Sequence, residues 1–329
     1  GGGDSDRIAV QVLATGERRI LAEGGSNPRY AGGYLVFVRA GTLLAAPFDL
    51  EQLRLTGTPV PVAEGIGGQS STGLAYYATA DDGSLAYNPG GYEQKFSLLW
   101  VDRKGTSRPV PAVPGFFHDL RLSPDGKRAA MNLSTDSRSD LWVYDLIRDA
   151  LTRLTFEGAH SHAWHPDGKR LAYGSLQDAR GRSLFWKAAD GSTPEEQLVS
   201  SESNLAPTSW SPDGRVLAFN ENNPATRSDI MLLRPDGDRK PQPFLKTQFD
   251  EGGAMFSPGS EPRYVAYQSN ETGRYEVYVQ PFPGPGGKWQ ISTDGGVEPA
   301  WASHGRELFY RNGDRVMAVD VQTRPTFSA

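Results

Sequence analysis

The sequence predicts an all-β fold, a β-propeller built from four-stranded antiparallel blades, and three observations support this prediction. The tight-turn tripeptide Pro-Asp-Gly recurs at Pro124–Gly126, Pro166–Gly168 and Pro212–Gly214. Counting a degenerate copy at Asp82, the turn aspartates Asp82, Asp125, Asp167 and Asp213 are separated by 43, 42 and 46 residues. Apolar residues alternate with a period close to two, and no amphipathic helix of three turns interrupts them.

Each turn has a local physical basis. Proline presets φ, aspartate hydrogen-bonds the backbone of its own turn, and glycine accepts a positive φ. The stretch HAWHPDGKRLAYGS, residues 162–175, shows the complete unit: a strand, the turn and a second alternating strand. A period in the low-to-mid forties with four strands per unit is the signature of a propeller blade.

Successive strand patterns define the predicted blades of a single domain that spans residues 1–329. The blades cover residues 26–66, 74–112, 116–157, 158–201, 205–248 and 252–293, with a composite blade from 297–321 plus 6–22. Pairing of the N- and C-terminal strands would close the ring and protect two exposed sheet edges. Seven blades are expected, with six and eight as alternatives.

Composition excludes several classes of function. The net charge of −5, with both signs interspersed, gives no basic footprint for nucleic acid. The chain has no cysteine, which rules out disulfides and fits an extracytoplasmic location. No apolar run is long enough to cross a bilayer. The chain begins Gly1-Gly2-Gly3 without methionine, so we read it as a fragment without its targeting segment, and a membrane anchor in the parent chain stays open.

The repeated unit resembles a known family. Trp210–Phe219, reading WSPDGRVLAF, and the strand Asp140–Asp145, reading DLWVYD, are similar to the TolB-like repeat, a WD-like propeller blade of bacterial periplasmic proteins. Two further stretches, Tyr275–Trp289 and Gly41–Asp49, resemble the propeller regions that follow the membrane span of bacterial serine/threonine protein kinases. The resemblance implies a propeller and, by analogy, a sensor role.

Polar residues of the first strand of each blade are the candidate ligand site, because this strand lines the central channel. His118 and His160 occupy the same position in neighbouring blades, and His162 shares a strand face with His160. Matching positions in the other blades add further side chains at the channel mouth, namely Asp119, Tyr77, Thr208, Glu298 and Asn27. Imidazoles with a carboxylate are common metal ligands, so His118, His160 and His162 are candidate ligands for a divalent metal. A polar, water-filled channel lining without a ligand is the alternative.

Two other regular features are interpreted as structural. The turn aspartates lie one per blade and far apart, so they are expected to cap turn amides. The tryptophans Trp164, Trp210 and Trp301 occupy one repeat position, which favours packing between blades.

These patterns favour a non-catalytic, extracytoplasmic recognition propeller that binds a protein, peptide or small molecule, as the sensor part of a membrane-anchored serine/threonine kinase. No nucleophile elbow, phosphate loop or His-Glu-x-x-His motif is present, so no enzyme activity and no cofactor are expected. Two alternatives stay open. One is a metal-dependent propeller enzyme of lyase or lactonase type, with the metal in the channel. The other is a TolB-like assembly scaffold.

Overall fold

The computed structural model describes residues 7–69, 74–80, 82–89, 96–111, 116–135, 138–175, 182–284 and 286–329. Throughout these ranges the chain forms strands and turns, and none of the described segments is helical. Accordingly, no helix in them is long and apolar enough to cross a membrane. The all-β prediction with four-stranded antiparallel sheets is confirmed.

The chain divides into two compact units. The first unit comprises residues 1–117 and 133–139, and the second comprises residues 118–132 and 140–329. The prediction of one domain that spans residues 1–329, with the blade limits expected from the repeat, therefore stays a prediction.

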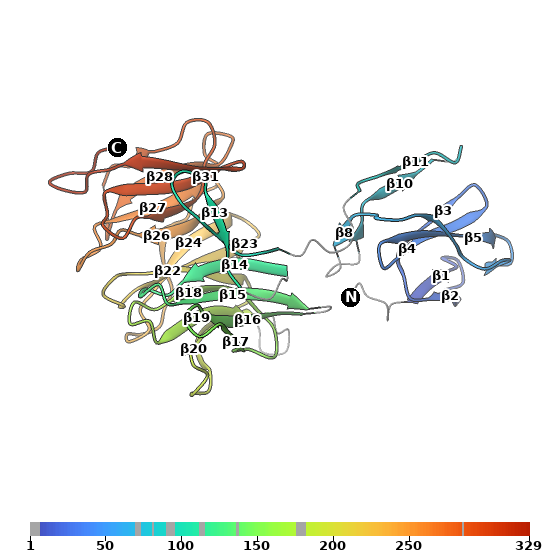
Figure 1. The fold of residues 1–329 in the computed structure, drawn as a ribbon, viewed down its shortest axis with the longest axis horizontal. Helices are drawn as coiled ribbons and strands as arrows, with labels where there is room; N and C mark the ends of the chain where they lie inside the picture. The colour runs from blue at the N-terminus through green and yellow to red at the C-terminus, as the bar shows by residue number, and fades with distance from the viewer. Residues whose placement is uncertain are drawn as a thin grey trace. The chain divides into compact units, whose positions relative to one another are not determined.

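The second unit contains successive sheets in which strands neighbour each other in chain order. Within the described residues these sheets are β14-β15-β16-β17, β18-β19-β20-β21, β22-β23-β24-β25, β26-β27-β28-β29 and the three-stranded β30-β31-β32. Figure 1 shows them following one another from green to red. The strands are β14 (Phe116–Leu122), β15 (Arg128–Thr135), β16 (Arg138–Asp145), β17 (Ala150–Arg153), β18 (Ala159–Trp164), β19 (Arg170–Ser175), β20 (Arg182–Ala188), β21 (Glu196–Ser201), β22 (Asn204–Trp210), β23 (Leu217–Asn223), β24 (Arg227–Leu233), β25 (Gln242–Leu245), β26 (Glu251–Phe256), β27 (Tyr264–Ser269), β28 (Glu276–Pro281), β29 (Trp289–Gln290), β30 (Val297–Trp301), β31 (Glu307–Asn312) and β32 (Arg315–Asp320).

The first unit holds one complete four-stranded set, β3-β4-β5-β7, with the short β6 also paired to β5. The segment 74–112 forms two-stranded pairs, β10-β11 and β12-β13, and residues 90–95 between them lie outside the described ranges. The strands are β1 (Arg7–Gln11), β2 (Arg18–Glu23), β3 (Ser26–Ala31), β4 (Tyr34–Arg39), β5 (Thr42–Asp49), β6 (Arg54–Leu55), β7 (Val60–Ala63), β8 (Gly68–Gln69), β9 (Leu74–Ala75), β10 (Tyr77–Thr79), β11 (Leu85–Tyr87), β12 (Leu99–Val101) and β13 (Ser107–Pro109).

The terminal strands pair locally. β1 pairs with β2, and β32 pairs with β31. The composite blade, the closure of the ring and the number of blades therefore stay predictions.

The core of the second unit lies between successive sheets. Leu184 of β20 and Phe219 of β23, for example, belong to one buried cluster that fills the space between their sheets. Burying an aliphatic or aromatic side chain of this size contributes about 1.5–3 kcal/mol. Two of the three repeated tryptophans add directional contacts. Trp164 Nε1 donates to the Arg121 carbonyl of the preceding sheet at 3.1 Å, and Trp301 Nε1 donates to the Met255 carbonyl in the same way at 3.0 Å. Their interpretation as packing residues fits these contacts.

The Pro-Asp-Gly turns close as the sequence predicts. The Asp213 carboxylate accepts hydrogen bonds from Ser211 Oγ at 2.5 Å and from the Arg215 amide at 3.1 Å. Ser211 Oγ in turn accepts the Val216 amide at 2.9 Å. Gly214 at the turn has a φ of +74°, which favours glycine. Asp125 makes the equivalent contacts with Ser123 and Lys127.

Replacing Asp213 with alanine should lower the free energy of unfolding by about 1 kcal/mol, because the turn loses two hydrogen bonds. Urea denaturation of both proteins measures the change. Asp320→Ala, at an exposed position near the C-terminus, is the matched control and should change stability by less than about 0.5 kcal/mol. Equal losses in both variants would show that the turn contacts do not stabilise the fold.

Candidate functional site

The first strands of the sheets share an irregularity at the predicted channel-lining position. The pairing register shifts there in β3, β18, β22, β26 and β30. The residue at this point adopts a left-handed conformation in most copies, and these residues are Asn27 (φ 55°), Asp119 (52°), Ser161 (45°), Gly253 (65°) and Glu298 (57°). In β22 the shift falls at Thr208, between Pro207 and Ser209. The feature is a β-bulge, which re-aims side chains at a strand.

Contacts to the adjacent sheet offset the cost of a left-handed residue, which is about 1–2 kcal/mol. In the second unit, Asp119 Oδ2 accepts the His162 amide at 3.1 Å, and the Glu298 amide donates to Gln268 Oε1 at 2.9 Å. In the first unit, Asn27 Nδ2 donates to the Ala75 carbonyl at 2.7 Å. The bulge therefore connects adjacent sheets, and we call this connection a joint. It is also a candidate binding surface.

A side-chain amide on the second strand reinforces the same joint. Asn132 Nδ2 donates to the Ala159 carbonyl at 3.0 Å, and its Oδ1 lies 2.9 Å from His162 Nδ1. Because Asn132 presents its oxygen, His162 must carry its proton on Nδ1 and donate it. Asn220 reaches the Glu251 carbonyl from the equivalent position at 3.5 Å.

His162 is fully buried by this arrangement, with 0% of its surface exposed. Burial is the largest influence on the imidazole and lowers its pKa to about 4, against an opposing effect of the Asp119 carboxylate. The folded structure therefore favours the neutral form of the His162 imidazole.

His160 occupies the space over Gly174. In this sheet Gly174 stands at the second-strand position that Asn132 and Asn220 hold in the neighbouring sheets. A Cβ on Gly174 would lie 2.4 Å from His160 Cε1 and 2.5 Å from the Leu205 carbonyl oxygen of the next sheet. Burial lowers the pKa of His160, while the Gly174 backbone and the Asn204 side chain partly offset this. His160 therefore fills the inter-sheet gap that Gly174 leaves.

The other predicted site residues have separate surroundings. His118 is exposed, and Thr208 donates within its own sheet to the Ala218 carbonyl at 3.0 Å. Tyr77 lies in the first unit, where its buried hydroxyl donates to the Asn27 carbonyl at 2.5 Å. No group of three or more His, Asp or Glu side chains in the described ranges is arranged to hold a metal ion. The metal site at His118, His160 and His162 stays a prediction that this geometry does not support.

Two ion pairs lie on the first and last sheets of the second unit. The sequence analysis predicted their acids, Asp119 and Glu298, but not their arginines, Arg121 and Arg311. Arg121 Nε lies 3.3 Å from Asp119 Oδ1, and Arg311 binds both carboxylate oxygens of Glu298 at 2.8 and 2.9 Å. The hydrogen bonds from Arg311 hold the pKa of Glu298 below its usual value, and Arg121 lowers it further. Side chains of β14 and β30 therefore interact electrostatically although their sheets are not sequence neighbours. We call Asp119, Arg121, Glu298 and Arg311 the central charged site.

The two arginines have weak sequence signals. Arg121 lies two residues after Asp119 on β14, and their side chains pair at 3.3 Å. Arg311 lies on β31 directly opposite Val297, the residue before Glu298. Only the strand register reveals that Arg311 reaches Glu298.

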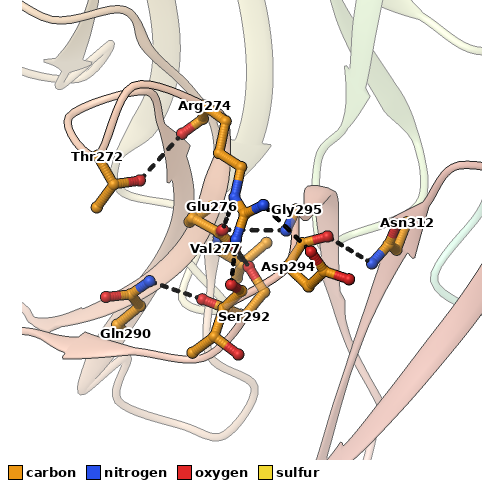
Figure 2. A network of polar contacts seen from close by, with 10 residues as sticks. Thr272, Arg274, Glu276, Val277, Gln290, Ser292, Asp294, Gly295 and Asn312 are labelled. Carbon is orange, nitrogen blue, oxygen red and sulfur yellow. Dashed lines mark hydrogen bonds and ion pairs between the residues drawn. The ribbon is translucent and has the colours of Figure 1, made fainter.

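A buried carboxylate at the start of the third strand is a second polar feature, and Figure 2 shows it at Glu276. Glu276 accepts hydrogen bonds from Arg274 Nε at 2.8 Å, from the Gly295 amide at 3.0 Å and from Ser292 Oγ. Burial acts to raise the pKa of Glu276, but these hydrogen bonds outweigh it and the pKa falls. We call this arrangement the carboxylate latch, because it ties the third strand to the link that leads to the next sheet.

A cavity of about 870 Å³ opens beside the β18–β21 sheet, and its lining carries both signs of charge. The Arg170 guanidinium stacks 4.3 Å from the centre of the Trp186 ring, and Trp186 Nε1 donates to Glu196 at 2.8 Å. Arg170 also pairs with Asp167 at 3.1 Å, while Arg128 and Lys187 donate to the backbone carbonyls of Gly168 and Leu154. Several charged groups of the cavity are therefore already bound within the protein.

Comparison with known proteins agrees with this architecture. The family model described as the TolB beta propeller domain matches residues 77–304. TolB from Acinetobacter baumannii is 14% identical, with 91% of this chain and 77% of that chain covered and a TM-score of 0.57. A chain of the nidogen/laminin complex is 12% identical over 87% and 89% of the two chains, with a TM-score of 0.53. The tricorn protease is 15% identical over 90% of this chain but only 25% of its own, with a TM-score of 0.50. At these identities the structures indicate the fold alone. No curated protein sequence matches significantly.

The buried His162 should make the protein sensitive to acid. Because its pKa is lower in the folded state than in the unfolded chain, stability is retained above pH 6.5 and is lost as the pH falls toward 4, by up to about 3 kcal/mol. His162→Asn retains a donor toward Asn132 without a titrating group. The stability gap between wild type and this variant, measured by denaturation at several pH values, should therefore narrow as the pH falls from 7 to 4. A gap that does not change with pH would contradict the buried, neutral His162.

Proposed function

Because this chain belongs to the TolB β-propeller domain family, we propose that it is a non-catalytic recognition propeller that binds a polypeptide partner at the central charged site. The family match and the all-β architecture are consistent with a binding or scaffold role. Propellers present loops and strand ends from a rigid framework, which suits recognition better than large conformational change.

The observation that carries this proposal is that the bulge residues Asp119 and Glu298 each form an ion pair with an arginine, Arg121 and Arg311. Arg121 in the first sheet of the second unit contributes to the lowered pKa of Glu298 in the last sheet. The Glu298 and Arg311 side chains are 64% and 48% exposed, and those of Arg121 and Asp119 are 37% and 26% exposed, so all four can be reached from solvent. Two guanidinium groups and two carboxylates can pair with both signs of charge on an extended peptide, and Arg forms well-oriented bonds with carboxylates.

We extend this proposal to the cellular location of the propeller and to the protein of which it is part. We place the propeller outside the cytoplasm, as the sensor part of a membrane-anchored serine/threonine kinase. The supporting features are the absence of cysteine and the resemblance of Tyr275–Trp289 and Gly41–Asp49 to kinase-associated propellers. The structural neighbour from the nidogen/laminin complex belongs to an assembly of proteins, which favours a protein partner over a small molecule.

Neutralising the central charged site should abolish specific capture of the partner. Immobilised wild-type protein and the double variant Arg121→Gln, Glu298→Gln are incubated with extracytoplasmic extract of the source organism. Captured proteins are then quantified by mass spectrometry. A partner that binds through charge pairs at this site should lose at least about tenfold in affinity for the double variant.

Arg148→Gln is the matched control, since its side chain is 83% exposed in the turn between β16 and β17. This variant should capture the partner as well as wild type does. Equal capture by wild type and the double variant would show that the central charged site is not the binding surface. A stable complex that survives the double variant would instead favour a TolB-like assembly scaffold that uses another face.

A further inference from the structure

The carboxylate latch occurs in three sheets of the second unit, with a buried acid at the start of each third strand. Asp140 of β16, Asp229 of β24 and Glu276 of β28 are 2%, 0% and 1% exposed. In β16, Asp140 accepts Thr155 Oγ1 at 2.9 Å, the Gly158 amide at 3.1 Å and Arg153 at 2.6 Å. This is the pattern that Glu276 follows with Ser292, Gly295 and Arg274. Two of the three latches are therefore complete, single-carboxylate sites.

The latch of the β22–β25 sheet is built differently. Thr247 corresponds to Thr155 and Ser292, but its hydroxyl contacts the Glu251 carboxyl instead of Asp229. The position of Gly158 and Gly295, three residues further along, is taken by Asp250. Asp250 uses its side chain to accept the Ser228 amide at 3.2 Å. The Glu251 carboxyl therefore binds the Thr247 hydroxyl, the group that would correspond to the hydroxyl partner of Asp229.

Both acids retain an oxygen without a partner. Asp229 Oδ2 accepts Thr226 Oγ1 at 2.7 Å and lies 3.3 Å from Lys246 Nζ. Asp229 Oδ1 and Glu251 Oε2 are buried and have no hydrogen-bond partner in the described part of the chain. Glu251 itself is only 2% exposed. A buried polar atom without a partner is costly, and a buried charge without a partner is costlier still.

Two carboxylates act on Glu251, and each of them also binds a lysine. Burial raises the pKa of Glu251 most; hydrogen bonds from Thr247 oppose this, while the Asp229 and Glu271 carboxylates raise it further. Burial raises the pKa of the Tyr267 phenol on β27 most, and the Glu271 and Glu251 carboxyl groups raise it further. Lys246 contacts Asp229, and Lys288 is bound to Glu271. Two like charges at one buried site favour the retention of one proton.

We propose that Glu251 and Asp229 share one proton at neutral pH, with Glu251 Oε2–H donating to Asp229 Oδ1. This hydrogen bond satisfies both unpartnered oxygens and completes the third latch. Loss of the proton at higher pH leaves two buried carboxylates facing each other. Their repulsion weakens the link at residues 246–251, which connects the β22–β25 sheet to the β26–β29 sheet.

Glu251→Gln tests the proposal in the full chain. The glutamine amide keeps a donor toward Asp229 at every pH, so the variant should gain stability relative to wild type as the pH rises. Since Glu251 has a raised pKa when folded, its stabilising protonated form is complete below the ordinary pKa of glutamate and is lost as the pH rises through the folded value. Between these two values the wild-type unfolding equilibrium constant should rise about tenfold per pH unit relative to the variant.

Glu276→Gln is the matched control, because it changes the same latch position in the next sheet. Glu276 has a lowered pKa and is stabilised as a carboxylate, so this variant should lose stability at neutral pH. The loss should shrink as the pH falls, which is the opposite sign to Glu251→Gln. The same sign for both variants, or a Glu251→Gln effect that does not vary from pH 4 to 8, overturns the proposal.

Infrared spectroscopy gives an independent measurement if a variant does not fold. Wild-type protein at pH 7 should show the carbonyl band of a protonated carboxylic acid, shifted in D₂O. Glu271→Gln should leave this band in place, since Glu271 lies outside the proposed pair. Absence of the band from wild type at pH 7 overturns the proposal.

Discussion

The buried hydrogen bonds that join each sheet to the next are the interaction on which the second unit depends. Apolar clusters fill the space between successive sheets, but such contacts are not directional. The direction comes from a few polar bridges, such as Trp164 to the Arg121 carbonyl and Ser209 Oγ to the Ala254 carbonyl at 2.7 Å. Because these bridges bind backbone groups of the adjacent sheet, they fix how each sheet is rotated and shifted against its neighbour.

These bridges also explain the histidines whose grouping in the sequence suggests a metal site. Asn132 and Asn220 bridge neighbouring sheets from the second strand, whereas the β18–β21 sheet has Gly174 at this position and fills the gap with the His160 ring. His162 is the donor that satisfies Asn132. These two histidines thus act at successive joints, and each joint uses its imidazole in the neutral form.

The sequence predicts features whose causes are local, whereas features that depend on register between strands escape it. The Pro-Asp-Gly turn depends on a few adjacent residues, so the sequence alone identifies Asp125 and Asp213 as turn caps. The bulge also keeps a fixed place in the repeat, and Asp119 and Glu298, which the repeat period aligns, do share it. By contrast, Arg311 meets Glu298 only because β31 pairs with β30 across Val297, and no spacing in the chain indicates this. A β-pairing shifted by one residue would turn these side chains to the opposite face.

Repetition itself provides the reference against which an unusual residue can be judged. An isolated buried Glu251 could be explained in many ways, but the same position is Ala159 in one sheet and Gly296 in another. A Cβ on Gly296 would lie 2.5 Å from Ser292 Oγ, so a side chain at this position is directed at the latch hydroxyl. Glu251 therefore enters the latch because of its backbone position, and its length delivers a second carboxyl group to a site that elsewhere holds one. The excess of one acid over the repeated pattern, rather than the burial of an acid as such, is what requires a proton at this joint.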